Sequence, residues 1–164
     1  GLEKDGETGS ISTDPENHDL MDHLRWDKVA RIPVPDLKVL GDEADADLLI
    51  VGFGSTYGHL YSAMEELRRK GHKVALAQFK YVNPLPKNTP EVLARYKKVV
   101  VAEQNLGQLA ALLRIRINNF APYQYNQVKG QPFVVSELVS TFEKLLKAPL
   151  PKEESGTFYT KILQ

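Results

Sequence analysis

The chain has 164 residues, no cysteine and a formal net charge of zero; 42% of its residues are hydrophobic and 26% are charged. This length suits a single domain that buries a core of its own. A neutral chain has no positive field to attract nucleic acid or an anionic membrane, so neither is expected as a partner. The lack of cysteine excludes disulfides, thiolate zinc sites and cysteine-ligated iron–sulfur clusters within these residues.

No apolar run reaches the roughly 18 residues that a bilayer span requires. No signal peptide is visible either, and we expect a cytoplasmic protein. The four histidines show no metal-ligand spacing, so no metal site is expected. The chain begins with glycine instead of methionine, and we expect it to be excised from a longer polypeptide.

The pattern along the chain divides it into a linker, one domain and a tail. Residues 1–20 are polar and acidic with few periodic apolar positions, which predicts a linker. A weak helical pattern follows over residues 21–31, and residues 34–40 favour an edge strand because proline is tolerated there. The domain is predicted to span residues 21–150, and residues 151–164 are predicted to form an extended tail.

Within the domain, continuous apolar runs of strand length alternate with segments of helical periodicity. Such runs are typical of strands buried on both faces. The alternation therefore predicts an α/β fold with a largely parallel sheet covered by helices on both sides. The predicted strands are residues 47–53, 73–79, 97–102 and 123–128; the predicted helices are residues 57–70, 106–117 and 136–147, with a short helix that begins at Thr89-Pro90 and has Thr89 as its N-cap.

Ligands bind such sheets at the carboxyl ends of strands, which selects the loop 52–58 as a first candidate site. Its spacing, G-x-G-x-x-x-G, permits close backbone approach, and Gly54, Ser55 and Thr56 precede a helix N-terminus that suits an anion. The dinucleotide fingerprint has a different spacing, and it requires an acidic residue where this chain has Gln78. The alternative is a tight strand-to-helix turn with Ser55 or Thr56 as the N-cap.

The second candidate is the loop 102–108, where polar residues follow an apolar strand and precede an apolar helix. Glu103, Asn105, Gly107 and Gln108 are the candidate ligand or interface residues. They can form a hydrogen-bond network across a cleft or a subunit boundary. A catalytic Glu103 needs a partner that raises its pKa, and none is evident. The alternative is that Glu103 and Asn105 satisfy the exposed N–H groups of the next helix.

The helix predicted over residues 106–117 carries apolar residues on two sides. One stripe, expected to face the sheet, comprises Leu106, Leu109, Ala110, Leu113 and Ile117. A second stripe comprises Ala111, Leu112 and Ile115, bordered by Arg114 and Arg116. A surface helix of a monomer needs only one apolar stripe, so the second either packs inside the domain or contacts another chain. We favour a partner interface at Leu112, Arg114, Ile115 and Arg116.

Several motifs occur in an order that resembles one family. They are LIVGFGST at residues 49–56, LRRKGHKV at 67–74, NPLP at 83–86, VVVAEQNLGQL at 99–109 and Leu113-Arg114. This order resembles the C-terminal part of the α subunit of 2-oxoacid:ferredoxin oxidoreductases, most closely the 2-oxoglutarate type. The Glu-x-Asn-x-Gly-Gln-Leu string is the more specific element, whereas the Gly-Ser-Thr turn alone is common.

The resemblance implies a fold like the transketolase C-terminal domain: a three-layer sandwich around a five-stranded, mostly parallel sheet with one antiparallel strand. It also implies a complex that converts 2-oxoglutarate and coenzyme A into succinyl-CoA and carbon dioxide and reduces ferredoxin. Thiamine diphosphate, magnesium and the iron–sulfur cluster are then expected in the partner β subunit. The remaining α-subunit regions are also expected partners, no cofactor is expected on this chain alone, and no catalytic residue is assigned to it.

The resulting hypothesis is a non-catalytic assembly domain whose isolated chain is inactive. Two alternatives belong to other classes. One is a stand-alone nucleotide- or coenzyme A-binding module that uses the loop 52–58. The other is the dimerisation domain of a transketolase-like enzyme or of a 2-oxoacid dehydrogenase β subunit.

Overall fold

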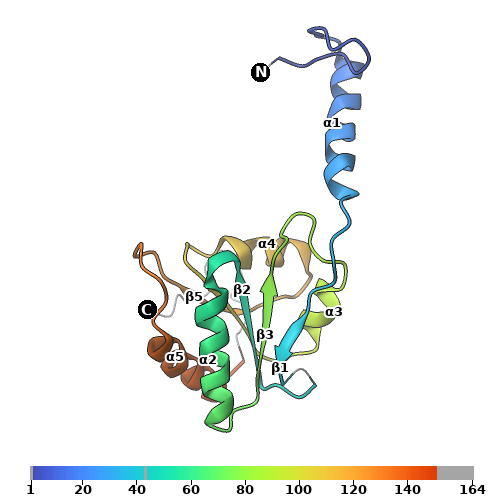
Figure 1. The fold of residues 1–164 in the computed structure, drawn as a ribbon. Helices are drawn as coiled ribbons and strands as arrows, with labels where there is room; N and C mark the ends of the chain where they lie inside the picture. Colours follow the sequence, from blue (N-terminus) through green and yellow to red (C-terminus); the bar gives the residue numbers. More distant parts are fainter. Residues whose placement is uncertain (1, 43, 151–164) are drawn as a thin grey trace.

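A computed structural model of the chain describes residues 2–42 and 44–150. An α/β body carries one long helix that projects from it (Figure 1). In chain order the elements are α1 (Pro15–Ala30), β1 (Val39–Gly41), β2 (Leu48–Phe53), the 3-10 turn η1 (Gly54–Thr56), α2 (Tyr57–Arg69), β3 (Val74–Phe79), α3 (Thr89–Ala94), β4 (Val99–Glu103), α4 (Gln108–Arg116), β5 (Tyr123–Asn126) and α5 (Val135–Lys147).

The five strands form one sheet in the order β1-β3-β2-β4-β5. Strands β2 to β5 pair in parallel, and β1 pairs with β3 in the antiparallel direction, with Val39 opposite Ala77. The structure thus confirms the mostly parallel five-stranded sheet with one antiparallel strand. It also confirms the edge strand predicted within residues 34–40, although β1 is shorter than that range. The interior strand β4, which lies between β2 and β5, is buried at every position, as its apolar run predicts.

Helices cover both faces of the sheet, which confirms the three-layer arrangement. Helices α2 and α5 pack on one face, where Leu60, Leu67 and Phe142 are fully buried. Helices α3 and α4 pack on the other face through residues such as Leu93 and Leu113. Because each strand contributes side chains to both faces in alternation, the sheet separates two apolar clusters of similar size.

The helix α1 begins six residues earlier than the predicted helical pattern and so extends into the range predicted as a linker. Asp14 caps it by accepting a hydrogen bond from the backbone N–H of Asn17 at 3.3 Å, and Pro15 occupies the first turn. Both features are typical helix-start signals. Before the helix, Lys4 and Ile11 form an isolated antiparallel bridge. The predicted linker therefore contains a small hairpin and the first turns of α1.

At two other helix starts, a predicted hydroxyl cap does not form its capping hydrogen bond. Thr89 does not cap α3, because its buried hydroxyl donates to the carbonyl of Pro86 at 2.7 Å. Thr56 occupies the predicted N-cap position of α2, but its side chain makes no capping hydrogen bond, because its hydroxyl bonds the backbone of Phe53. Short hydroxyl side chains bond nearby backbone groups in turns as readily as at helix caps. The predicted tail, residues 151–164, lies outside the described residues.

None of the helices in the described ranges combines the length and the apolar character that a membrane-crossing segment needs.

Candidate functional site

The loops 52–58 and 102–108 meet at the carboxyl end of the sheet, because β2 and β4 are neighbouring parallel strands. The structure therefore brings the two sequence-predicted candidate sites to one edge. Helix α1 projects on this same side of the body (Figure 1). Open parallel sheets bind ligands at this end. Whether this domain can do so depends on which side chains of the two loops are free to contact a ligand.

Glu103 is the last residue of β4, and its side chain is almost fully buried. One carboxylate oxygen accepts a hydrogen bond from the backbone N–H of Leu109 at 2.6 Å, and the other accepts from Ala110 at 3.0 Å. Both N–H groups belong to the first turn of α4, which has no other intrahelical partner for them. The carboxylate thus stabilises the helix N-terminus, where negative charge is favourable.

Asn105 has the same kind of role one turn earlier. Its side-chain oxygen accepts from the backbone N–H groups of Gly107 and Gln108, at 2.8 and 2.9 Å. Together Glu103 and Asn105 satisfy four backbone donors at the start of α4. The structure therefore confirms the helix-capping alternative for these two residues, with each carboxylate oxygen of Glu103 accepting one backbone hydrogen bond.

Gly107 has a left-handed backbone with φ of 93° and is buried against β5. A Cβ atom placed on it would lie 2.4 Å from Oε1 of Gln124 and 3.1 Å from Nδ2 of Asn126. Only glycine meets both the φ requirement and the close approach. Gly107 lets α4 turn directly over the end of β5. Gln108, by contrast, is exposed beside it.

The loop 52–58 is a tight turn in which the candidate residues are largely engaged with their own backbone. Thr56 is buried; its hydroxyl donates to the carbonyl of Phe53 at 2.9 Å and accepts from the N–H of Phe53 at 3.3 Å. The carbonyl of Gly54 accepts from Nε2 of Gln78 at 3.0 Å. Ser55 is exposed, with its side chain free of any recorded bond within the described ranges. The structure thus confirms the tight strand-to-helix turn predicted as the alternative for this loop, but without a side-chain cap from Ser55 or Thr56.

The sequence patterns did not single out the amides that gather at this end of the sheet. Gln78 is the penultimate residue of β3. Asn126 is the last residue of β5, and Gln127 follows it. Among the buried side-chain atoms of the described residues, Oε1 of Gln78, Oδ1 of Asn126 and Oε1 of Gln127 have no hydrogen-bond partner. The sequence did carry a signal for these amides: they stand where apolar strands end. Polar residues at the ends of parallel strands lie at the carboxyl end of the sheet.

Helix α4 corrects the two-stripe prediction. Leu106, predicted to face the sheet, lies outside the helix and is 65% exposed. Leu112, assigned to the outer stripe, is half-buried and packs against the α3–α4 core cluster. Ile115 is 74% exposed and Arg116 is exposed, whereas Arg114 is half-buried. The helix begins at Gln108, two residues later than predicted. Leu106 therefore precedes the helix and is not part of its inner stripe.

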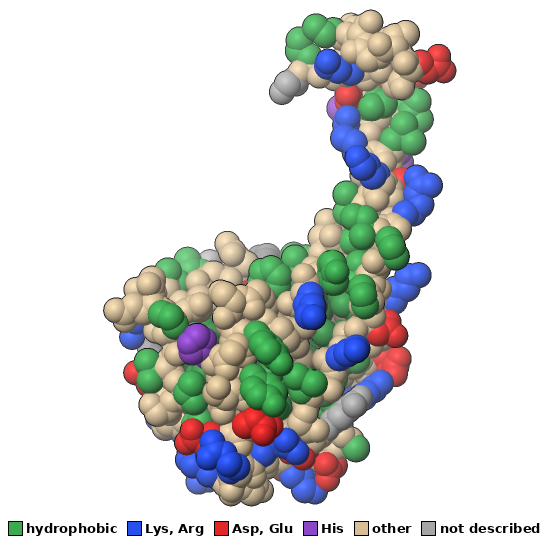
Figure 2. Space-filling view, in the orientation of Figure 1, with side chains coloured by type: hydrophobic (Ala, Val, Ile, Leu, Met, Phe, Trp, Pro, Cys, Tyr) green, Lys and Arg blue, Asp and Glu red, His purple; other side chains and the backbone are tan. Residues whose placement is uncertain are grey.

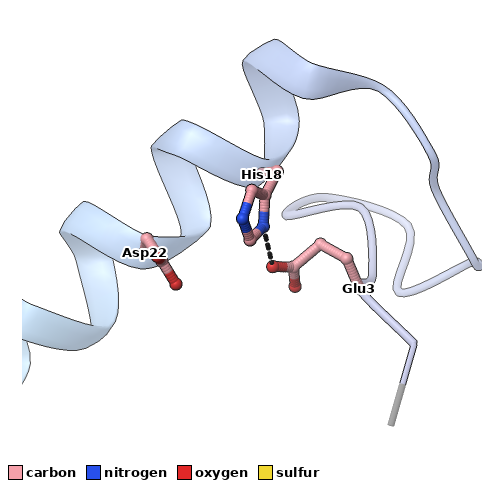
Figure 3. Close-up of side chains that lie close together, drawn as sticks. All are labelled: Glu3, His18 and Asp22. Carbon is pink, nitrogen blue, oxygen red and sulfur yellow. Dashed lines mark hydrogen bonds and ion pairs between the residues drawn. The ribbon is translucent and has the colours of Figure 1, made fainter.

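A second cluster of ionisable groups lies far from the sheet, where the N-terminal hairpin contacts α1 (Figure 3). Nδ1 of His18 lies 3.0 Å from the Glu3 carboxylate, and Asp22 lies one turn further along the helix. The three side chains place ligand-type atoms within 4.8 Å of one another. However, Arg25 donates two hydrogen bonds to Glu3, at 3.1 and 2.9 Å, and a third to Asp22. A guanidinium thus already pairs with both carboxylates.

The pKa values in this cluster follow from these contacts. Hydrogen bonds from Arg25 and His18 hold the pKa of Glu3 far below its usual range. The hydrogen bond to Glu3 and the charge of Asp22 raise the pKa of His18. Each shift favours the charged form of the group. We interpret the cluster as an ion-pair network that fastens the hairpin to α1.

The fold as a whole is that of a transketolase-like domain. A split-gene transketolase, solved as an inactive beta4 tetramer, superposes on 67% of this chain and 41% of its own with a TM-score of 0.51 at 17% identity. Residues 46–137 match the family model for pyruvate:ferredoxin oxidoreductase core domain II, and the chain belongs to this family. The resemblance read from its motifs is thereby confirmed.

The relatives are oxidoreductase subunits. The chain is 47% identical over 138 residues to the 2-oxoglutarate oxidoreductase subunit KorA of Mycobacterium tuberculosis, covering 84% of this chain and 21% of that subunit. It is 33% identical to the alpha subunit of 2-oxoacid:ferredoxin oxidoreductase 2 of Aeropyrum pernix, covering 90% and 24%. The chain therefore spans about a fifth to a quarter of these relatives.

Among solved structures, the chain is similar to 2-oxoglutarate:ferredoxin oxidoreductase from Magnetococcus marinus, described with 2-oxoglutarate, coenzyme A and succinyl-CoA bound. The two share 32% identity and a TM-score of 0.75, over 87% of this chain and 26% of that one.

Proposed function

We propose that the chain is a non-catalytic assembly domain of the α subunit of a thiamine-dependent 2-oxoglutarate:ferredoxin oxidoreductase. The proposed parent enzyme converts 2-oxoglutarate and coenzyme A into succinyl-CoA and carbon dioxide, with reduction of ferredoxin. The choice of 2-oxoglutarate is supported by the 47% identical relative and the 32% identical solved structure, which both bear that substrate in their names.

The observation that carries the assembly role is the engagement of Glu103. It provides the sole carboxylate in the loop 102–108, and both its oxygens accept backbone hydrogen bonds at 2.6 and 3.0 Å. A general base must have a lone pair within reach of the substrate proton. Because Asn105 is engaged in the same capping, the candidate loop supports the fold of α4 rather than acid–base chemistry.

The cofactors of the proposed enzyme belong to its other polypeptide. With no cysteine, the chain has no thiolate to ligate an iron–sulfur cluster. As the resemblance to the family implies, thiamine diphosphate and magnesium are proposed to bind the β subunit, with coenzyme A as cosubstrate and ferredoxin as acceptor. The remaining loop residues Gly54, Ser55 and Gln108 are proposed to border a partner rather than to bind a ligand alone.

The outer side of α4 is proposed as one point of contact with that partner. Ile115 is 74% exposed, and Arg116 beside it is exposed as well. Exposed apolar side chains bordered by arginine are typical of interface positions. Leu112 is left out of this contact because it packs against the domain's own core.

The proposal is tested in the assembled enzyme by Glu103→Gln and Asn105→Ala. We expect both variants to lower the yield of assembled enzyme while kcat and KM per assembled complex stay within about twofold of wild type. Ser62→Ala is the matched control, since Ser62 is exposed on α2 and belongs to neither candidate loop. A large loss of kcat in fully assembled Glu103→Gln enzyme contradicts a non-catalytic role.

Calorimetric titration separates the proposal from the stand-alone binding module. The 164-residue chain is titrated with coenzyme A, NAD(P)H and FAD in turn. No saturable heat is expected, because the 52–58 turn uses its polar groups internally. Tight binding of any of the three ligands supports the module instead.

A further inference from the structure

The two ends of the sheet differ in surface charge. The amino-end loops hold paired charges: Arg68 with Asp42, Lys73 with Asp45, and Lys70 with Glu143. At the carboxyl end, the loops after β2, β3, β4 and β5 (residues 53–57, 80–88, 104–108 and 127–134) contain no Asp or Glu, whereas the segment that enters β1 beside them contributes the exposed Asp36. The exposed charges of these four loops are Lys80, Lys87 and Lys129, and none of them has an ion-pair partner within residues 2–42 and 44–150.

The same loops expose large apolar side chains. We define the carboxyl-end face by Phe53, Tyr81, Leu106, Val128 and Val134, whose exposed fractions run from 41% to 65%. Each of them follows a strand or lies just before a helix at this end of the sheet. Monomeric domains seldom gather exposed apolar residues on one side, and such gatherings mark interaction sites.

Unpaired acceptors accompany this apolar surface. The three buried side-chain oxygens without partners, on Gln78, Asn126 and Gln127, all lie at the carboxyl ends of β3 and β5. Asn126 and Gln127 line a groove of about 920 Å³ that also contacts Leu106, Val128 and Lys129. The groove is also lined by Glu137 and Lys144 of α5, and it hollows the surface beside the exposed apolar side chains.

Helix α1 extends the surface upward from the same end of the body (Figure 1). Its side chains Leu20, Leu24 and Trp26 are 52%, 46% and 68% exposed. Hydrophobic side chains are visible along this helix and where it joins the body (Figure 2). A helix whose apolar side chains are this open is covered by little of the described chain, and α1 meets the body mainly beside Pro84 and Arg116.

We propose that the carboxyl-end face and α1 together bind a neighbouring folded domain of the oxidoreductase. Its contact surface is apolar and bordered by carboxylates that pair with Lys80, Lys87 and Lys129. This inference rests on the proposed function. Since the chain matches only 21% of the Mycobacterium tuberculosis relative, ample polypeptide of that enzyme class remains to supply the domain.

Charge favours such a domain over a second copy of this chain. A twofold contact through the carboxyl-end face would set its lysines opposite the same lysines of the other copy. Like charges in an interface are unfavourable, whereas a carboxylate-bordered surface pairs with all three. Of the chain's own carboxylates at this end, Glu103 is buried and bonded to the first turn of α4. Asp36, before β1, and Glu137, in the first turn of α5, are exposed.

The test is co-purification of the tagged chain with the remaining polypeptides of the oxidoreductase, expressed together. The double variant Leu106→Asp/Val128→Asp removes two of the most exposed apolar groups. We expect recovery of partner to fall about tenfold or more. Leu150→Asp is the matched control: Leu150 is 51% exposed and lines a pocket at the amino end of the sheet.

A second pair of variants covers the possibility that the apolar changes disturb the fold. Lys80→Glu/Lys129→Glu is expected to lower recovery, and added salt is expected to weaken wild-type binding; Lys97→Glu at the amino end is the control. If the wild-type chain and every face variant recover the partner equally well, the carboxyl-end face is not the binding surface, and the proposed function stands. If wild type recovers no partner, the proposed function itself fails. If the chain alone forms dimers and the face variants abolish them, the face binds a second copy of the chain instead of a neighbouring domain.

Discussion

The carboxylate of Glu103 reaches from the last residue of β4 to the backbone N–H of Leu109, at 2.6 Å, in the first turn of α4. This contact ties a buried strand to the next helix. It also turns the most conspicuous acidic residue of the carboxyl end into a structural element, which has direct consequences for stability.

Glu103→Gln is expected to destabilise the 164-residue chain by about 1–3 kcal/mol, because a buried amide replaces one acceptor oxygen with a donor that faces a backbone N–H. The measurement is equilibrium unfolding in urea, followed by circular dichroism. Glu16→Gln, an exposed change in the first turn of α1, is the control. Equal stability of both variants would mean that the cap contributes nothing.

Two glycines near the 52–58 turn are expected to respond oppositely to alanine. A Cβ on Gly52 would lie 2.3 Å from Cδ1 of Leu60 and 2.5 Å from Oε1 of Gln78, so Gly52→Ala forces the packed α2–β3 contact apart. Gly58 lies in α2 with open space around it, and Gly58→Ala is expected to stabilise the domain by up to about 1 kcal/mol. Thermal melts of both variants check this, and a loss of stability in Gly58→Ala contradicts it.

Lys98 is expected to hold the end of α5 in place. Its Nζ donates to the carbonyls of Leu145, Leu146 and Ala148, at 3.2, 2.6 and 2.7 Å, where a helix leaves acceptors unsatisfied. Lys98→Met is expected to cost about 1–3 kcal/mol and to speed amide exchange in the last turn of α5. Lys97→Met, the exposed neighbour, should change neither; protection in α5 that is unaltered in both variants would exclude the role.

Docking of the N-terminal hairpin is expected to weaken as the pH rises. Glu3 and Asp22 raise the pKa of His18 above its ordinary 6.5, while the charge of Arg25 opposes the shift. A raised pKa means that protonated His18 stabilises docking fully below pH 6.5, and the contribution is lost as the pH rises through the folded value. NMR titration of the His18 ring and amide exchange at Ser12, which bonds Glu3, follow the two events.

Glu3→Gln provides the control for this pH effect. The variant removes the hydrogen-bonded carboxylate that is the largest cause of the shift. The His18 pKa should therefore return toward 6.5, and the protection factor of the Ser12 amide, corrected for its intrinsic exchange rate, should lose its pH dependence. An unchanged His18 titration in Glu3→Gln would show that the contact does not form in solution.

Two of the residues assigned to the second stripe of α4, Leu112 and Ile115, are expected to behave differently. Leu112→Arg places a charge against the α3–α4 core and is expected to destabilise the chain by about 1–3 kcal/mol. Ile115→Glu changes a 74% exposed position and is expected to stay within about 0.5 kcal/mol. Urea unfolding of the two proteins decides the matter; if Ile115→Glu is the more harmful change, Ile115 is internal.

Much of the fold could be read from local patterns. The run Leu48–Phe53 is apolar at strand length, and β2 is buried at every position except its last. Pro33 and Pro35 restricted the next segment to a sheet edge, where β1 lies. The start of α1 was missed because its apolar pattern is weak, although Asp14 and Pro15 carried the signal that a helix begins there.

By itself the sequence determined the alternation of strands and helices, the loops that meet at the carboxyl end, and the lack of a thiolate, because each follows from neighbouring residues or from composition. Only the tertiary structure decided which polar groups are engaged. Glu103 was compatible with either a cap or a site, and Lys98 reaches carbonyls 47 to 50 residues away. Hydrogen bonds of this kind depend on how separate elements are placed in space, and periodicity along one element carries no information about that placement.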